Sequence, residues 1–85
     1  MNDQSIPEPA ENLEITELED GLVIQCGESI HTLNETAREI FYLCDGHHTV
    51  AEIIEKIQRQ YSGENIDTAI RDLIGNFQNR NIVHI

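Results

Sequence analysis

The chain has 85 residues, enough for one domain with a modest hydrophobic core. Its 16 acidic residues against five Lys and Arg give a formal charge of −11, which argues against binding nucleic acid or an anionic membrane. No apolar run approaches the ~20 residues of a membrane span, and no basic start followed by an apolar stretch marks a secretory signal. We therefore expect a cytoplasmic protein in which Cys26 and Cys44 are buried thiols.

The first part of the chain predicts a tail followed by strands. Residues 1–11 contain two prolines and several polar groups, and they predict a disordered tail, so that the folded domain covers residues 12–85. From residue 13, apolar and polar side chains alternate, which predicts a half-buried strand and a second strand over residues 22–26. A third short strand covers residues 29–33. The short turns between them favour an antiparallel meander.

The hydrophobic period changes from 2 to 3.6 at Asn34, a good N-cap for a helix over residues 35–44. Thr49 and Glu52 form the capping box of a second helix, near residues 50–61. A third helix is predicted near residues 66–79, with Asn65 as a possible cap, and residues 82–85 form a short strand or an apolar tail. This order predicts an α+β fold, with three antiparallel strands followed by three helices that pack on one face of the sheet.

No residue spacing in the sequence supports a catalytic, metal-binding or phosphate-binding site. Cys44, His47 and His48 would offer a metal ion three ligands without a clear fourth, and the two histidines are typical of a solvated turn. Neither cysteine has the flanking motif of a nucleophile, and the isolated glycines form no phosphate-binding loop. We expect no catalytic residues, no metal and no cofactor.

Binding is the remaining class of function. A three-stranded sheet has two edges, and an extended peptide can add a strand to a free one. The third strand carries no Pro or Lys that would block such pairing. The alternative is that this edge is covered by the chain itself. Because the edge could also pair with itself, the sequence leaves open a monomer or a weak or swapped dimer.

Three short strings resemble the pyrroloquinoline-quinone synthesis protein D (PqqD-like) family, and the match extends over roughly residues 12–85. The strings are Leu33-Asn34-Glu35-Thr36-Ala37, Leu43-Cys44-Asp45-Gly46 and Thr49-Val50-Ala51-Glu52-Ile53. Asn81 stands where the family often has Gly, and His47-His48 replace other turn residues. The resemblance implies a winged-helix-like peptide-recognition domain. Such a domain is expected to bind the leader of a ribosomally synthesised precursor peptide and to present it to a modifying enzyme such as a radical SAM protein, a cyclase or a leader peptidase.

The resemblance also implies that the leader pairs with the third strand and lies against the third helix. The leader-binding residues expected on this sequence are Glu28, Ser29, Ile30, His31 and Thr32 from the strand, and Asp67, Ile70, Arg71 and Ile74 from the helix. Two alternatives stay open. Ile74 either forms the floor of the groove or widens the core stripe, and Arg71 pairs either with a leader carboxylate or with Asp67 one turn away.

Two other functional classes compete with peptide binding. A winged-helix DNA-binding or protein-interaction regulator fits the topology, but the charge of −11 opposes DNA binding. An acyl carrier is also small and acidic, but it needs an attachment serine that opens a helix. Ser5, Ser29 and Ser62 fall instead in the tail, in a strand and at a helix end.

Overall fold

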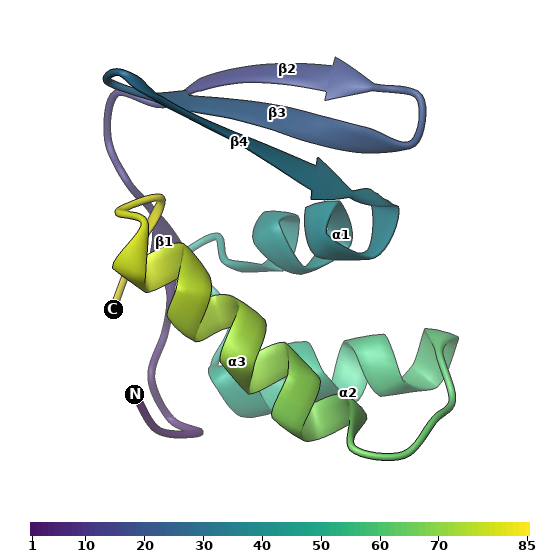
Figure 1. The fold of residues 1–85 in the computed structure, drawn as a ribbon. Coiled ribbons are helices and arrows are strands. Elements are labelled where there is room, and N and C mark those ends of the chain that lie inside the picture. Colours follow the sequence, from purple (N-terminus) through teal and green to yellow (C-terminus); the bar gives the residue numbers. More distant parts are fainter.

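The structure, a computed structural model, describes all 85 residues. Three antiparallel strands precede three helices, as predicted, and the α+β fold class is confirmed (Figure 1). A two-residue strand lies near each end of the chain. In chain order the elements are β1 (Glu8–Pro9), β2 (Glu14–Leu18), β3 (Gly21–Cys26), β4 (Ser29–Asn34), α1 (Glu35–Leu43), α2 (Val50–Gln60), α3 (Ile66–Asn79) and β5 (Val83–His84).

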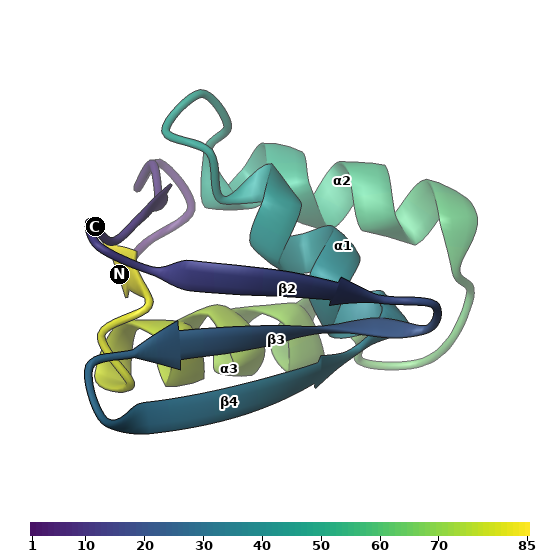
Figure 2. The same cartoon turned by 90° about the horizontal axis from the view of Figure 1, so that it is seen from above.

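The main sheet has the strand order β2-β3-β4, so that β2 and β4 are its two edges (Figure 2). The β3–β4 hairpin turns over two residues, and Gly27 takes a φ of 61°, which favours glycine at the first central position of such a turn. All three helices lie on one side of the sheet, and no helix covers its other face (Figure 1).

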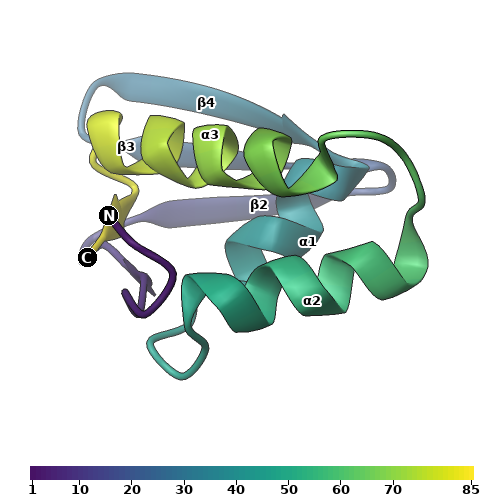
Figure 3. The ribbon, with the colours of Figure 1, turned by 90° about the horizontal axis from the view of Figure 1, so that it is seen from below.

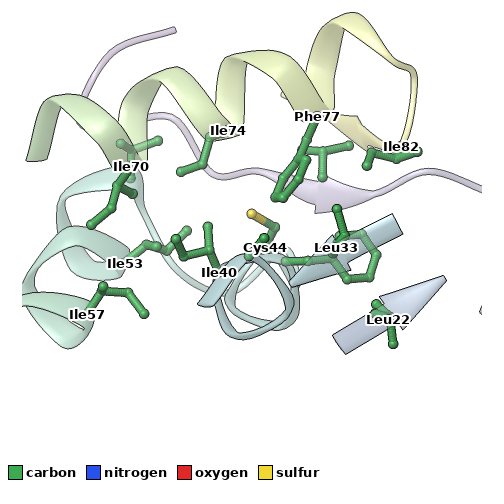
Figure 4. Close-up of a cluster of buried hydrophobic side chains, with 14 of the residues drawn as sticks. Leu22, Leu33, Ile40, Cys44, Ile53, Ile57, Ile70, Ile74, Phe77 and Ile82 are labelled. Carbon is green, nitrogen blue, oxygen red and sulfur yellow. The ribbon is translucent and has the colours of Figure 1, made fainter. Parts of the chain in front are cut away.

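The core lies between the sheet and the helices and consists of 16 buried hydrophobic residues (Figure 4). β3 supplies Leu22 and Ile24, and each helix contributes one apolar stripe. The rings of Phe41 on α1 and Phe77 on α3 pack edge to face, with their centroids 6.0 Å apart. The structure corrects one prediction about this core: β2, predicted as half-buried, is exposed at all five residues and is an edge strand that pairs with β3 alone.

All three helices start where the sequence predicts, and the predicted side-chain caps are confirmed at two of the three starts. The Asn34 side chain accepts a hydrogen bond from the Ala37 N–H at 2.8 Å, and Thr49 and Glu52 form the reciprocal capping box. These bonds satisfy amide groups that have no partner within their helix. Asn65 is different, because it adopts a left-handed conformation with φ 60° and its side chain makes no capping bond.

The N-terminal segment, residues 1–11, differs from the disordered tail that the sequence predicts. The N–H groups of Val50 and Ala51 donate to the carbonyls of Ser5 and Asp3 at 2.9 and 3.0 Å, and β1 pairs with β5. The first turn of α2 has amide groups in need of acceptors, and the segment supplies them. It therefore runs beside α2 and α3 (Figure 3). No helix in the fold has the length and apolar character needed to cross a membrane.

Candidate functional site

The free edge of β4 is the first component of the candidate site. β3 pairs with β4 on one side, and no strand lies on the other. The pair Cys26–Ser29 closes the two-residue turn, and hydrogen-bonded and non-hydrogen-bonded pairs alternate along an antiparallel hairpin. From this alternation, the backbone N–H and C=O groups of Ser29, His31 and Leu33 point to β3. Those of Ile30 and Thr32 point to the open edge.

The side chains of β4 divide between the two faces of the sheet. His31 and Leu33 lie opposite the buried Ile24 and Leu22, and therefore face the helices. Ile30 faces the uncovered side and is 64% exposed. The Nε2 atom of His31 is buried and has no hydrogen-bond partner. Since buried polar atoms are usually paired, this one gives the strand an unused hydrogen-bonding group on the side of the helices.

An apolar cavity of about 290 Å³ lies between the three helices and adjoins the last residue of β4. Eight of the ten residues that line it are hydrophobic, so it is suited to an apolar side chain. α1 contributes its first turns, α2 its last turns and α3 its first half. The lining residues are Asn34, Thr36, Ala37, Ile40, Ile57, Tyr61, Ile66, Ala69, Ile70 and Leu73.

The helix residues predicted for the site do not come together at this cavity. Ile70 lines it, but Ile74 is 0% exposed and points into the core (Figure 4). The alternative in which Ile74 widens the core stripe is therefore correct, and the groove-floor alternative is wrong. Arg71 donates to Asp67 at 3.1 Å and to Asp3 of the N-terminal segment at 3.0 Å. Both carboxylates raise the pKa of Arg71, with Asp3 the larger cause.

Ile66, Ala69 and Leu73 also line the cavity, although none of them is among the binding residues expected from the sequence. Successive helix residues differ by about 100°, so Ala69 and Arg71 lie on opposite flanks of Ile70. The Arg71 flank faces the N-terminal segment, and the Ala69 flank faces the cavity. Ala69 is exposed, and an apolar residue at the margin of a stripe is the one sequence signal that favours this flank.

The cysteine and histidine residues around the first helix end do not converge. Cys44 is buried, and burial raises the pKa of its thiol to about 12. In the following turn, Asp45 accepts hydrogen bonds from His48 Nδ1 and from the His47 N–H, both at 2.9 Å. The bond from His48 is the main reason that the pKa of Asp45 is lowered. No three His, Cys, Asp or Glu side chains lie where they could hold a metal ion.

Comparisons with known proteins agree on one family and one fold. Residues 21–83 match the family model described as coenzyme PQQ synthesis protein D (PqqD). A protein of Methylococcus capsulatus named "PqqA binding protein" is 33% identical over 66 residues, which cover 78% of this chain and 71% of that protein.

Two solved structures share the fold at low sequence identity. One is described as TbiB1 in complex with the TbiA(beta) leader peptide. Its TM-score is 0.80 at 16% identity, over 91% of this chain and 94% of that chain. The other is the heterocyclase TruD, with a TM-score of 0.68 at 14% identity, where the match covers 92% of this chain and only 11% of TruD. The fold thus occurs both as a separate chain and as a small part of a larger enzyme.

Proposed function

We propose, from the premise that this chain belongs to the PqqD family, that it binds the leader of a ribosomally synthesised precursor peptide and presents it to a modifying enzyme. The observation that carries the proposal is the free edge of β4 beside an apolar cavity. Two relatives support it. One is named for binding PqqA, and the other shares the fold and is described in complex with a leader peptide.

The leader binds as an additional strand on β4. The outward backbone groups of Ile30 and Thr32 pair with its main chain, which gives affinity without demanding a particular sequence. Its side chains alternate between the two faces, so that those on the helix side reach the space between β4 and α3. One bulky apolar side chain enters the cavity beside Leu73 and supplies specificity.

The chain acts as a non-catalytic partner in this proposal. The only fully buried thiol, that of Cys44, has a pKa raised to about 12, so it is protonated at neutral pH and unsuited to act as a nucleophile. Chemistry on the peptide then belongs to a separate cytoplasmic enzyme, such as a radical SAM protein, a cyclase or a leader peptidase.

Amide chemical-shift mapping tests the proposal, with synthetic PqqA as the first probe because the 33% identical relative is named for binding it. We expect the largest shifts at residues 29–34 and at residues 66–73. A matched peptide with proline at alternate positions serves as the control, because it cannot form a strand ladder. Shifts confined to α2 and the His47-His48 turn, with β4 silent, would contradict strand addition.

A further inference from the structure

The end of the apolar cavity that is remote from the sheet is formed by α2. Figure 1 shows α1 directly below the sheet and α2 farthest from it, so a side chain that enters from the β4 edge reaches α2 last. α2 contributes Ile57, and the residue after its last turn contributes the half-buried Tyr61. We call Ile57 and Tyr61 the back wall of the cavity. The back wall limits how long a side chain the cavity can hold.

A hydrogen bond holds the Tyr61 ring in the back wall. The Tyr61 hydroxyl donates to Glu39 Oε2 on α1 at 3.2 Å, and the bond is partly buried. The backbone of Tyr61 is extended, with φ −127° and ψ 136°, and its N–H donates to the Ile57 carbonyl at 3.0 Å. The side chain is thus fixed at both ends, by the backbone beside α2 and by a carboxylate of α1. A fixed aromatic ring gives the cavity a defined depth.

A second hollow, of about 250 Å³, lies on the other side of the back wall, and its lining includes Glu39 and Ile57. Ile57 also lines the cavity, and Glu39 accepts the bond from Tyr61, so the back wall separates the two spaces. A side chain too long for the cavity would have to displace the Tyr61 ring to pass into the hollow.

The volume of the cavity indicates which side chains end at the back wall. An apolar cavity of roughly 150 Å³ holds a benzene molecule. The cavity here has about 290 Å³, and it must also admit the stem that joins a ring to a strand on β4. One ring or a branched aliphatic chain therefore fits in front of Tyr61. Two fused rings require more depth, and a packed apolar wall resists overfilling.

We propose that Tyr61, positioned by Glu39, determines which apolar side chain of a leader peptide the cavity accepts. Side chains with one ring or a branched aliphatic chain end at the Tyr61 ring, and side chains with two fused rings have to displace it. The identity of the ligand as a leader rests on the proposed function, whereas the size limit of the cavity does not. Tyr61 contacts the ligand, and Glu39 acts through Tyr61 as a positioning residue.

The size limit is measured on the full chain with two small alcohols, benzyl alcohol with one ring and 2-naphthylmethanol with two. Methyl shifts of Ile57, Ile70 and Leu73 report binding in the cavity and give both affinities. In Tyr61→Ala, the affinity for the two-ring alcohol relative to the one-ring alcohol should rise by about tenfold. Tyr42→Ala removes an aromatic ring that lines only the second hollow, so it should change this ratio by less than about twofold.

Variants of the hydrogen bond test the positioning role of Glu39. Glu39→Ala and Tyr61→Phe each remove the bond and keep an aromatic ring in the back wall. Each should raise the ratio by the same smaller amount, about threefold, and the double variant should raise it no further. Glu39→Gln keeps an acceptor oxygen and should retain the native ratio. Because these variants keep the ring, they test the back wall even where circular dichroism shows that Tyr61→Ala does not fold.

Three results would overturn the assignment of Tyr61: an unchanged ratio in every folded variant of Tyr61 and Glu39, an equal change in Tyr42→Ala, or no methyl shifts at Ile70 and Leu73 with either alcohol. PqqA binding to the native chain is measured separately. If the alcohols behave as expected and PqqA does not bind, the proposed function fails and the size limit stands. If PqqA binds and the ratio does not change, only the assignment of Tyr61 is rejected.

Discussion

At the scale of single residues, Leu73 and Ile74 are neighbours on α3 with different roles: one lines the cavity and the other belongs to the core. Ile74 is fully buried in the core, and Leu73 is half-buried and lines the cavity beside β4. Both are large aliphatic residues on an apolar stripe, so composition does not separate them. Their difference comes from the 100° rotation between neighbours, which turns Ile74 into the core and Leu73 toward the cavity.

Aspartate at these two positions therefore has different effects. Ile74→Asp buries a carboxylate without a partner, which costs several kcal/mol in a domain whose total stability is on the order of 5–15 kcal/mol. We expect it to unfold much of the protein, as seen by circular dichroism. Leu73→Asp should keep the fold and weaken PqqA binding by roughly tenfold to a hundredfold in calorimetry.

Arg71→Ala is the matched control for the Leu73 variant, because Arg71 lies on the opposite flank and pairs with Asp3 and Asp67. It should change the peptide affinity by less than about twofold. A strong loss with Arg71→Ala and none with Leu73→Asp would place the peptide on the flank of the N-terminal segment instead.

At the scale of elements, the hairpin register of β4 makes a prediction about proline. Ile30→Pro removes an N–H that points outward, so it should leave the β3–β4 ladder intact and weaken PqqA binding by about tenfold. His31→Pro removes an N–H that points to β3 and should destabilise the fold. Denaturant unfolding and calorimetry measure the two effects. If His31→Pro folds normally and Ile30→Pro does not, the outward and inward assignments are reversed.

The capping box of α2 makes a pH-dependent prediction. The backbone N–H of Thr49 donates to the Glu52 carboxylate at 2.8 Å and is the main cause of the lowered pKa of Glu52. A lowered folded-state pKa means that the carboxylate stabilises the fold above its ordinary value of 4.5, and that this stability is lost as pH falls through the folded pKa. Glu52→Gln should therefore be less stable than the native chain at pH 7. The difference should shrink below pH of about 4, measured by urea unfolding. If the stability difference between Glu52→Gln and the native chain does not change with pH, the Glu52 carboxylate is not its cause.

The elements differ in how far the sequence predicts them, because their causes act over different distances. Caps such as Asn34 and the Thr49–Glu52 pair depend on residues three apart, and the sequence predicts them correctly. The exposure of β2 depends on which helices cover the sheet, which no local pattern encodes. The β4 edge follows from strand order alone. The flank of α3 that lines the cavity does not follow from strand order. The apolar stripe of α3 shows which side of the helix is buried, but it does not show which of the two neighbouring flanks lies toward β4.

At the scale of the whole molecule, the N-terminal segment ties distant parts of the chain together. Its carbonyls accept from the first turn of α2, its Asp3 pairs with Arg71 on α3, and β1 pairs with β5 near the C-terminus. These contacts lie on the flank of α3 opposite the cavity. The segment therefore contributes to stability without closing the space beside β4.

Removal of residues 1–7 tests this division between stability and binding. The deletion leaves the N–H groups of Gly46, Val50 and Ala51 without their carbonyl acceptors, exposes the surface that Pro7 covers and frees Arg71. Exposed surface ion pairs contribute little, so most of the loss comes from the amide bonds and the proline, on the order of 1–3 kcal/mol. We expect a lower midpoint of urea unfolding and an affinity for PqqA within about twofold of the full chain under folding conditions.

Asp3→Ala removes only the Arg71 pair, and it should lower the stability by less than about 1 kcal/mol. A deletion that keeps full stability but loses the peptide would show that the segment belongs to the binding site and not to the scaffold.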